Sequence, residues 1–431
     1  MNPTIGFAGM THLGLNSAVA AAEKGFNVVG FDLSVSLISE LNEGQLPVSE
    51  PQLDTMLKSN QMRLHFTAKI EELCQCDLVY IAPDVPTDHT GKSDLTALTD
   101  LIKHIDQALP TEAIIVLLSQ VPPGFSRKLR LKDGRIHFYQ VETLIFGQAI
   151  VRALYPERII IGTDEPQRAL PEAYASFLLR FDCPILSMRF ESAELCKISI
   201  NCCLVASVSV ANTLAEICEH NGADWSEIAP ALKLDKRIGS HAYLSPGLGI
   251  SGGNLERDLN TVIELSKQYG TDASVVSAWI HNSIHRKNWP FETLIKHKNS
   301  GQPLVLAVWG LAYKQDTHST KNSPSIAFIR EVIDAWPKES LRIQVYDPQV
   351  SAVELDGHHL QSTSSPELAC QGADVLAILT PWTHFKTFST ACIRNHMTGN
   401  LVVDPYRMLS VEDARQAGLQ QISLGTLSES I

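Results

Sequence analysis

The sequence is short of basic residues: 35 Lys and Arg stand against 47 Asp and Glu, giving a net charge of −12 over 431 residues. An acidic chain argues against nucleic acid or an anionic membrane surface as a general partner. No uninterrupted run of 18 apolar residues is present, and the first residues, MNPTIGFAG, contain no basic segment typical of a signal sequence. We therefore expect a soluble, cytoplasmic protein that binds neither membranes nor nucleic acid.

The sequence also lacks the cysteine spacing of a metal site. Cys74 and Cys76 have no second pair at the distance expected for zinc. Four of the nine cysteines fall within residues 191–224, where small buried thiols are expected. A chain of this size without a secretion signal is not expected to rely on disulfides. We predict no bound metal and no disulfide framework.

Strand-like and helix-like segments alternate over residues 3–162 and again over residues 304–404, and helices alone are expected between them. Such alternation is typical of parallel, doubly wound sheets. A chain of 431 residues is also too long for one hydrophobic core. We predict the α/β class, with two Rossmann-like doubly wound parallel-sheet domains joined by a helical central domain that contains a long helix. The expected boundaries are 1–190, 191–296 and 303–431.

A strand, a glycine-containing turn, a helix and a second strand are expected over residues 3–32. A dinucleotide-binding turn normally reads G-x-G-x-x-G, and here its three positions are Gly9, Thr11 and Gly14. Thr11 places a Cβ where the backbone normally approaches the pyrophosphate. Asp32 ends the second strand, where a carboxylate suits a ribose diol and disfavours a 2′-phosphate, so the pattern favours NAD over NADP. The alternative is that Asp32 is a surface acid at the end of a strand.

A long helix is predicted from Glu191 to Asn221, because no Pro or Gly occurs before Gly222. Lys197 and Asn201 are four residues apart and therefore share a face, with Glu194 one turn before Lys197. The simpler interpretation is a surface ion pair between Lys197 and Glu194. The functional interpretation is that Lys197 and Asn201 belong to a polar site.

A flexible loop is expected after this helix, since residues 245–253 contain four Gly and one Pro. Its backbone can approach a ligand closely. Helices are expected from about Leu259 to Tyr269 and from about Asp272 to Lys287. Between loop and helix lies a polar cluster of Asn254, Glu256, Arg257 and Asp258.

At this point the chain resembles a known family, the nucleotide-sugar dehydrogenases of the UDP-glucose 6-dehydrogenase and GDP-mannose dehydrogenase group. The similarity covers nearly the whole chain, and the order and spacing of its segments make it specific. Besides the first turn with Asp32, the matching segments are 41–57, 85–95, 142–149, 155–163, 192–201, 237–258, 310–325, 345–348 and 379–385.

The resemblance implies an NAD-dependent oxidation of the sugar C6 alcohol to a carboxylate in two steps, in which a cysteine captures the intermediate aldehyde as a thiohemiacetal and then a thioester. It implies that Lys197 and Asp258 assist deprotonation and stabilise the oxyanion. Asn201 would contact the substrate through its amide, and Glu142 would serve the hydrolytic step. Arg237 would reach the substrate of a neighbouring subunit.

The resemblance also implies which residues bind the two ligands. Positions expected to bind NAD are Gly9, Thr11, Gly14, Asp32, Pro86, Thr87 and Lys321. Positions expected to contact the nucleotide sugar are Leu144, Arg237, Tyr243, Leu244, Gly249, Gly252 and Lys314. Lys321 stands where the family has arginine, which keeps the charge but loses bidentate contact.

The main departure concerns the nucleophile. The family reads G-G-S-C-[FL]-P-K-D, and this chain reads SGGNLERD over residues 251–258, so Asn254 occupies the position of the catalytic cysteine. An amide cannot form a thiohemiacetal, so the covalent second oxidation loses its nucleophile. The cysteine nearest to Asn254 in the sequence, Cys218, lies back on the long helix.

Three functions are compatible with these residues. The first is an NAD-dependent nucleotide-sugar oxidoreductase, acting on a UDP-sugar, with altered chemistry. Such an enzyme would stop at the aldehyde, oxidise a ring hydroxyl, or reach the acid slowly through a hydrated aldehyde with Glu142 as base. The second is a catalytically impaired paralogue that binds a nucleotide sugar or regulates an active homologue. The third is an ordinary four-electron dehydrogenase that takes a cysteine from elsewhere in the fold.

The long helix also bears on assembly. Its small and apolar residues suit the core of a homodimer, as the resemblance implies. The alternative is that the domains of its own chain cover the helix.

Overall fold

The computed structural model describes residues 2–88, 91–350 and 360–427. His89 and Thr90 of the matching segment 85–95 therefore lie outside the described residues. The chain divides into two compact units, Met1–Ile200 and Asn201–Ile431, which we describe one at a time.

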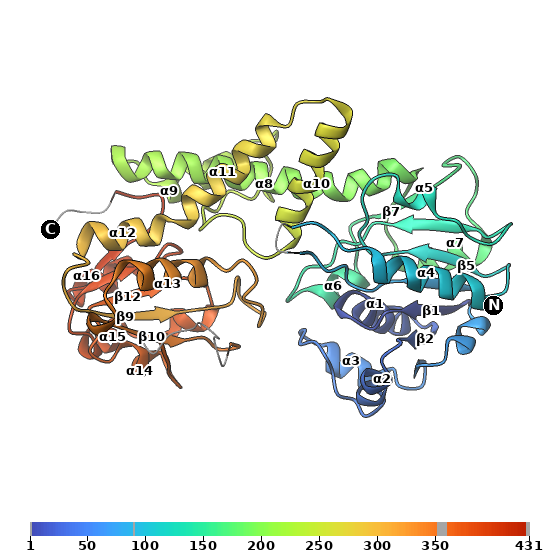
Figure 1. Ribbon diagram of the computed structural model, residues 1–431, viewed down its shortest axis with the longest axis horizontal. Helices are drawn as coiled ribbons and strands as arrows, with labels where there is room; N and C mark the ends of the chain where they lie inside the picture. Colours follow the sequence, from blue (N-terminus) through green and yellow to red (C-terminus); the bar gives the residue numbers. More distant parts are fainter. Residues whose placement is uncertain (1, 89–90, 351–359, 428–431) are drawn as a thin grey trace. The chain divides into compact units, whose positions relative to one another are not determined.

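The first unit is built on an eight-stranded sheet with the order β3-β2-β1-β4-β5-β6-β7-β8 (Figure 1). The strands are β1 (Thr4–Ala8), β2 (Asn27–Phe31), β3 (Leu64–Thr67), β4 (Leu78–Ile81), β5 (Ile114–Leu117), β6 (His137–Gln140), β7 (Ile159–Thr163) and β8 (Ile185–Arg189). The first six follow the doubly wound dinucleotide-binding order. The predicted parallel sheet is confirmed with one exception, since β6 and β7 run antiparallel.

Helices cover both faces of this sheet. One face packs against α1 (His12–Glu23), α2 (Val35–Asn42), α3 (Leu53–Ser59), α6 (Ala149–Leu154) and α7 (Glu172–Leu178). The other face packs against α4 (Thr96–Ala108) and the short 3-10 helix η1 (Ile70–Gln75). The unit also contains α5 (Phe125–Lys128) and η2 (Leu179–Phe181). Strands β4 and β5 are buried along their whole length, which is why they read as continuous apolar runs in the sequence.

The second unit contains a six-stranded sheet with the order β11-β10-β9-β12-β13-β14, in which every pair of neighbours is parallel. Its strands are β9 (Leu304–Trp309), β10 (Leu341–Tyr346), β11 (Leu360–Ser362), β12 (Val375–Ile378), β13 (Leu401–Val403) and β14 (Gln420–Ile422). Counted from β9, this is again the order 3-2-1-4-5-6 of a doubly wound fold. The helices within this part are α13 (Pro324–Ala335), α14 (Pro366–Cys370), α15 (Thr390–His396) and α16 (Val411–Gln416), with η3 (Lys338–Ser340) and η4 (Thr383–Thr387).

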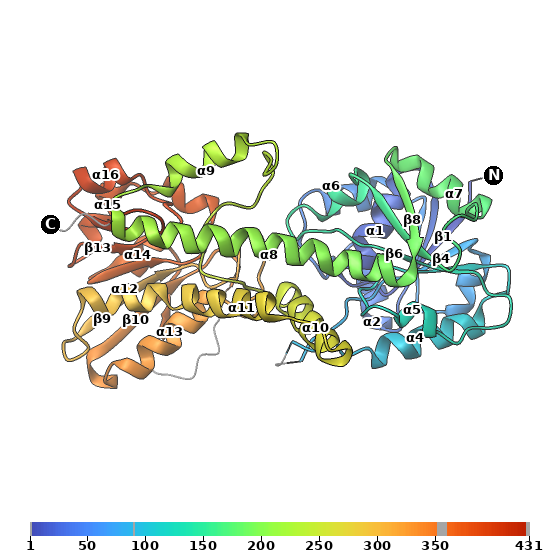
Figure 2. The same cartoon turned by 90° about the horizontal axis from the view of Figure 1, so that it is seen from above.

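The predicted long helix is α8, which spans Phe190–Asn221 and is drawn as one uninterrupted helix in Figure 2. It ends where the sequence predicts, and Gly222 follows with a φ of +81°, the left-handed conformation typical of a helix stop. Four more helices follow: α9 (Trp225–Leu234), α10 (Asn254–Tyr269), α11 (Ser274–Lys287) and α12 (Trp289–His297). The helix predicted from about Leu259 to Tyr269 is present as α10 and ends at Tyr269, but it begins earlier, at Asn254, and includes the polar cluster. Helices α9 and α12 were not predicted.

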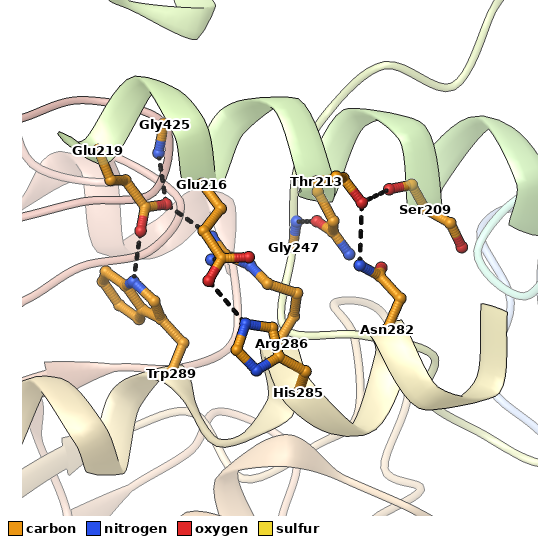
Figure 3. A network of polar contacts seen from close by, with 11 residues as sticks. Ser209, Thr213, Glu216, Glu219, Gly247, Asn282, His285, Arg286, Trp289 and Gly425 are labelled. Carbon is orange, nitrogen blue, oxygen red and sulfur yellow. Dashed lines mark hydrogen bonds and ion pairs between the residues drawn. The ribbon is translucent and has the colours of Figure 1, made fainter. Parts of the chain in front are cut away.

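A polar network joins α8 to α11, α12 and a segment close to the C-terminus (Figure 3). The Glu219 carboxylate accepts hydrogen bonds from Arg286 Nη2 at 2.6 Å, from the Trp289 indole at 3.0 Å and from the Gly425 backbone N–H at 3.0 Å. The Arg286 side chain is only 1% exposed. Because a buried charge needs a partner, Glu219 and Arg286 depend on each other.

Among the described residues, α8 alone is long and apolar enough to cross a membrane, with a mean hydropathy of 1.6 in an 18-residue window of which 39% is buried. The sequence contains no uninterrupted apolar run at α8, because Ser and Asn residues occur among the apolar residues of this helix. A core helix of a soluble protein passes the same test, so length and composition alone decide nothing here.

Replacing Glu219 with alanine tests the network. The variant removes the nearer of the two carboxylates that contact the buried Arg286 guanidinium and leaves only Glu216, at 3.5 Å. We expect it to lower the free energy of unfolding by about 3 kcal/mol. Urea denaturation followed by tryptophan fluorescence measures the change. The matched control is Glu264→Ala on the exposed surface of α10, where we expect a change within about 0.5 kcal/mol. Equal midpoints for the two variants would contradict a stabilising role for the network.

Candidate functional site

The turn between β1 and α1 requires glycine at two of its three predicted positions. Gly9 has a φ of +95°, and a Cβ on it would lie 2.6 Å from the backbone nitrogen of Pro83. A Cβ on Gly14 would lie 1.9 Å from the carbonyl oxygen of Gly9. These two positions therefore hold the tight turn and the close helix–strand packing that the dinucleotide fingerprint needs.

Thr11 takes the third position without strain. Its φ of −78° and ψ of −170° are extended and open to any residue. The hydroxyl accepts a hydrogen bond from the Asp84 backbone N–H at 2.9 Å, which joins the turn to the loop after β4. The departure from glycine thus gives the turn a new contact, and no backbone conformation that only glycine can adopt is lost.

Asp32 follows β2 at the carboxyl edge of the sheet. Its two carboxylate oxygens accept hydrogen bonds from the backbone N–H groups of Met10 at 2.8 Å and Ser34 at 2.9 Å. Beside it lies a cavity of about 180 Å³ whose lining is mostly apolar and includes Gly9, Asp32, Pro83, Pro86, Leu98 and Leu101. The lining also includes Asp84 and Asp94. A mostly apolar cavity with the Asp32 carboxylate at the end of β2, next to the start of a helix, fits the adenosine part of a dinucleotide. The predicted Thr87 lies nearby in sequence and forms a β-bridge with Ser93.

The first unit also brings Lys197, Glu142 and Leu144 together. The Lys197 ammonium lies 2.6 Å from a carboxylate oxygen of Glu142, and both side chains are largely buried. The other Glu142 oxygen accepts a hydrogen bond from the Leu144 backbone N–H at 2.9 Å. An ammonium and a carboxylate in such contact can exchange and hold a proton next to a bound substrate.

The simple interpretation of Lys197 as a surface partner of Glu194 was wrong. Lys197 is 8% exposed, and Glu194 is fully buried. The Glu194 carboxylate instead accepts hydrogen bonds from the backbone N–H groups of Gly124 at 2.5 Å and Ser126 at 2.8 Å. Burial raises the pKa of Glu194, and these two hydrogen bonds oppose that shift. Glu194 therefore anchors the loop before α5.

In the second unit, Asn201 and Asp258 meet in the interior. The Asn201 amide donates to one Asp258 oxygen at 2.5 Å, and the other oxygen lies 3.1 Å from Arg257 Nε. Asp258 is 1% exposed. The pairing of Lys197 with Asp258 in a proton relay joins residues of different units and stays a prediction.

Asn254 is the first residue of α10 and is exposed. It lies four residues before Asp258 on the same helix, so the two side chains share a face. The Cys202 thiol lies on α8. Burial raises its pKa, and the negative charge of Asp258 adds a smaller increase, to a value of about 11. A thiol with this pKa is protonated at neutral pH and is a poor nucleophile.

The predicted substrate loop is held by close backbone contacts. Gly249 has a φ of +75°, and a Cβ on it would lie 2.3 Å from the Ser283 carbonyl oxygen. Gly252 also has a positive φ of +74° and lies against the ring of Tyr313. The carbonyl oxygen of the buried Leu244 accepts a hydrogen bond from the indole N–H of Trp225 at 2.7 Å.

Other predicted ligand-binding residues of the second unit lie at the surface or on the loop before α13. Tyr243 is 50% exposed. The Arg237 side chain is 89% exposed and lies 2.6 Å from the carboxylate of its neighbour Asp235. Lys314 Nζ lies 5.9 Å from the centre of the Tyr313 ring. The Lys321 side chain lies beside Gly253, within 3.1 Å of the place where a Cβ on this glycine would stand.

The sequence did not predict a polar bridge that joins the loop before α13 to α10 and α11. Asn322 adopts the left-handed conformation with a φ of +52°. Its amide accepts from Lys287 Nζ at 2.5 Å and donates to the Glu256 carboxylate at 3.0 Å. Burial lowers the pKa of Lys287. No local pattern marks this bridge, because its members are 31 or more residues apart in sequence.

Comparisons with known proteins identify the family. The UDP-glucose/GDP-mannose dehydrogenase family models match residues 3–178 (NAD binding domain), 191–283 (central domain) and 307–411 (UDP binding domain). The chain belongs to the UDP-glucose/GDP-mannose dehydrogenase family. The predicted resemblance, the α/β fold, the oxidoreductase class and the NAD cofactor are therefore confirmed.

Relatives match over nearly their full length. The chain is 28% identical to the UDP-glucose 6-dehydrogenase YwqF of Bacillus subtilis, covering 99% of this chain and 98% of that protein. It is 29% identical to a UDP-glucose 6-dehydrogenase of Pseudomonas aeruginosa, covering 92% and 91%. A UDP-glucose dehydrogenase structure from Pyrobaculum islandicum superposes with a TM-score of 0.83 at 25% identity, covering 96% of each chain. The boundaries of the domains and the role of each site residue stay predictions.

Replacing Asp32 with asparagine tests the choice of cofactor. The amide keeps one acceptor oxygen but removes the charge that repels a 2′-phosphate. We expect the ratio of the dissociation constants of NADPH and NADH to fall about tenfold, which corresponds to about 1.4 kcal/mol. Quenching of protein fluorescence on titration with each cofactor measures it without any turnover. Asp100→Asn, an exposed residue of α4, is the control and should leave the ratio unchanged.

Proposed function

We propose that this protein oxidises a UDP-sugar with NAD by a route that forms no thioester. The observation that carries the proposal is Asn254, which opens α10 one turn before Asp258 and occupies the position of the family's cysteine. A carboxamide does not add to an aldehyde to give an oxidisable thiohemiacetal. The Cys202 thiol is a poor replacement for the missing nucleophile, because burial and the charge of Asp258 raise its pKa to about 11.

The proposed oxidation removes a hydride from carbon and a proton from the hydroxyl oxygen of the sugar. NAD, when bound, supplies the hydride acceptor. We assign the proton to Asp258, directly or through a water, and its carboxylate is held in place by Asn201 and Arg257. The Lys197 ammonium, paired with Glu142, is assigned to stabilise negative charge on the substrate oxygen.

Three products are compatible with this machinery. Hydride removal at a primary alcohol gives an aldehyde, and at a ring carbon it gives a ketone. A hydrated aldehyde can lose a second hydride and a proton to give the acid, with Glu142 as the base that activates the water. The slow acid route needs no covalent intermediate.

A turnover experiment separates these outcomes. The purified protein is mixed with NAD and a panel of UDP- and GDP-sugars, and the absorbance of the reduced cofactor is followed together with the product mass. One NADH per sugar and the loss of two hydrogens indicate a single oxidation. Rapid formation of two NADH per sugar, with the acid as the sole product, contradicts the proposal.

The alternative function is a nucleotide-sugar binder without turnover, or a partner that regulates an active homologue. Because Asn254 has no thiol, the sequence at this position supports this alternative as well. No NADH from any sugar in the panel, together with thermal stabilisation by one of them, would favour this alternative.

Replacing Asn254 with cysteine tests the role of this position. The new thiol would stand at the first position of a 16-residue helix, where the helix dipole favours the thiolate. We expect acid formation to rise at least tenfold, with two NADH per sugar.

The control for that variant is Asn254→Ser, which is of similar size but lacks the thiol and should leave the product profile of the wild type unchanged. An Asn254→Cys product profile equal to that of Asn254→Ser would contradict the proposal that only the nucleophile is missing.

We also propose that the protein is a soluble, cytoplasmic homodimer with domain boundaries near 190, 296 and 303. Along α8 of the second unit, the apolar residues Val210, Leu214 and Ile217 are 54%, 41% and 50% exposed. They continue the line of Cys203 and Ser207 at alternating spacings of about four and three residues, the seam spacing of packed helices. A second copy of the same helix suits this face, and such a contact accounts for its apolar character without a membrane.

Replacing Leu214 with glutamate tests the dimer. A carboxylate in an apolar helix seam is costly to bury, so we expect the variant to run as a monomer in size-exclusion chromatography with light scattering. Glu227→Gln on the exposed surface of α9 is the control and should keep the mass of the wild type. A wild-type protein of monomeric mass would refute the dimer outright.

A further inference from the structure

The first residue of the cofactor helix α1 has an unusual setting. The His12 side chain is buried, and its Nε2 lies 2.7 Å from a carboxylate oxygen of Glu50. The ring also stacks on Phe146, with ring centres 3.9 Å apart and an angle of 27° between the planes. The two partners of His12 thus come from distant parts of the first unit: the segment before α3 and the loop before α6.

Glu50 holds this loop directly as well. Its side chain is fully buried. The oxygen that contacts His12 also accepts from the Gly147 backbone N–H at 2.9 Å, and the second oxygen accepts from the Ala149 N–H at 3.2 Å. Burial raises the pKa of Glu50, but the hydrogen bonds from His12 and from these two N–H groups outweigh burial, and the net pKa is lowered. Glu50 is therefore a carboxylate with three donors.

Both of the segments that Glu50 joins carry predicted functional residues. His12 follows the turn of Gly9 and Thr11, where the N-terminus of α1 suits a pyrophosphate. Gly147 and Ala149 close the loop that starts at Glu142, the ion-pair partner of Lys197. A shift of this loop relative to α1 would move Glu142 with respect to the cofactor turn.

We propose that Glu50 is a positioning residue for the reaction, which holds the loop carrying Glu142 against the first turn of the cofactor helix through His12. The purely structural alternative is that Glu50 only fixes the fold of the loop. That alternative predicts a loss of stability with no change in cofactor affinity. The positioning role predicts that Glu50 and His12 act on NAD binding as one unit, because each variant breaks the same link. The proposal rests on the proposed function only for the turnover measurement.

The test uses Glu50→Gln, His12→Phe and the double variant, each as the full chain. Phenylalanine keeps the ring stacked on Phe146 but removes the contact with Glu50. We expect each single variant to weaken NADH binding about tenfold, and the double variant to bind no more weakly than the worse single variant, since the link is already broken. Fluorescence titration measures these affinities and needs no substrate, so a failure of the proposed oxidation does not affect the result.

The matched control is the second His–Glu pair of the same unit, His65 and Glu72, which are 2.5 Å apart and partly exposed. His65→Phe and Glu72→Gln should change NADH affinity less than twofold. With a UDP-sugar that is turned over, Glu50→Gln should raise the KM for NAD and lower kcat, with the KM for the sugar within twofold of the wild type. Unchanged NADH affinity, or additive losses in the double variant, would overturn the proposal. Should Glu50→Gln not fold, the NADH affinity of His12→Phe decides alone.

Discussion

The need to pair buried polar groups along α8 organises this protein. The helix is mostly apolar, yet it carries charged and amide side chains in its buried face, and each one requires a partner from another element. Glu194 binds the loop before α5, Lys197 binds Glu142, Asn201 binds Asp258, Asn212 binds the Gly247 backbone, and Glu219 binds Arg286. This helix thereby carries two of the predicted catalytic residues, Lys197 and Asn201, and contacts two more, Glu142 and Asp258.

In the proposed function, the groups around Asp258 and Lys197 support hydride removal, and Asn254 stands at the position of the nucleophile. Asp258 retains Asn201 and Arg257 as neighbours, and Lys197 retains Glu142. Asn254 stands at the start of α10, where the helix dipole would favour a thiolate if a cysteine were present. The proposed function therefore assigns hydride removal and covalent capture to different residues, and only covalent capture to position 254.

The first unit also connects the first turn of α1, which is predicted to bind the cofactor, with the loop that carries Glu142. Glu50 joins residues that are 38, 97 and 99 positions away in the sequence. A carboxylate that accepts three hydrogen bonds in the interior is stable only while all three donors stay in place. Hydrogen bonds of Glu50 consequently link the first turn of α1 to the loop of Glu142 within this unit.

Local sequence determined much of the fold. Continuous apolar runs predict β4 and β5. Backbone geometry requires the glycines of the first turn, Gly9 and Gly14. Gly222 predicts the end of α8. Strands β3, β6 and β8 were missed because they mix polar with apolar residues. The early start of α10 was missed because its first turn is polar. Only the tertiary structure decided that Lys197 binds Glu142 and not Glu194, and that Glu50 reaches His12 and Gly147. The physical reason is that backbone preferences act between neighbours in the chain, whereas the partner of a buried charge depends on which distant segments the fold brings within hydrogen-bond distance.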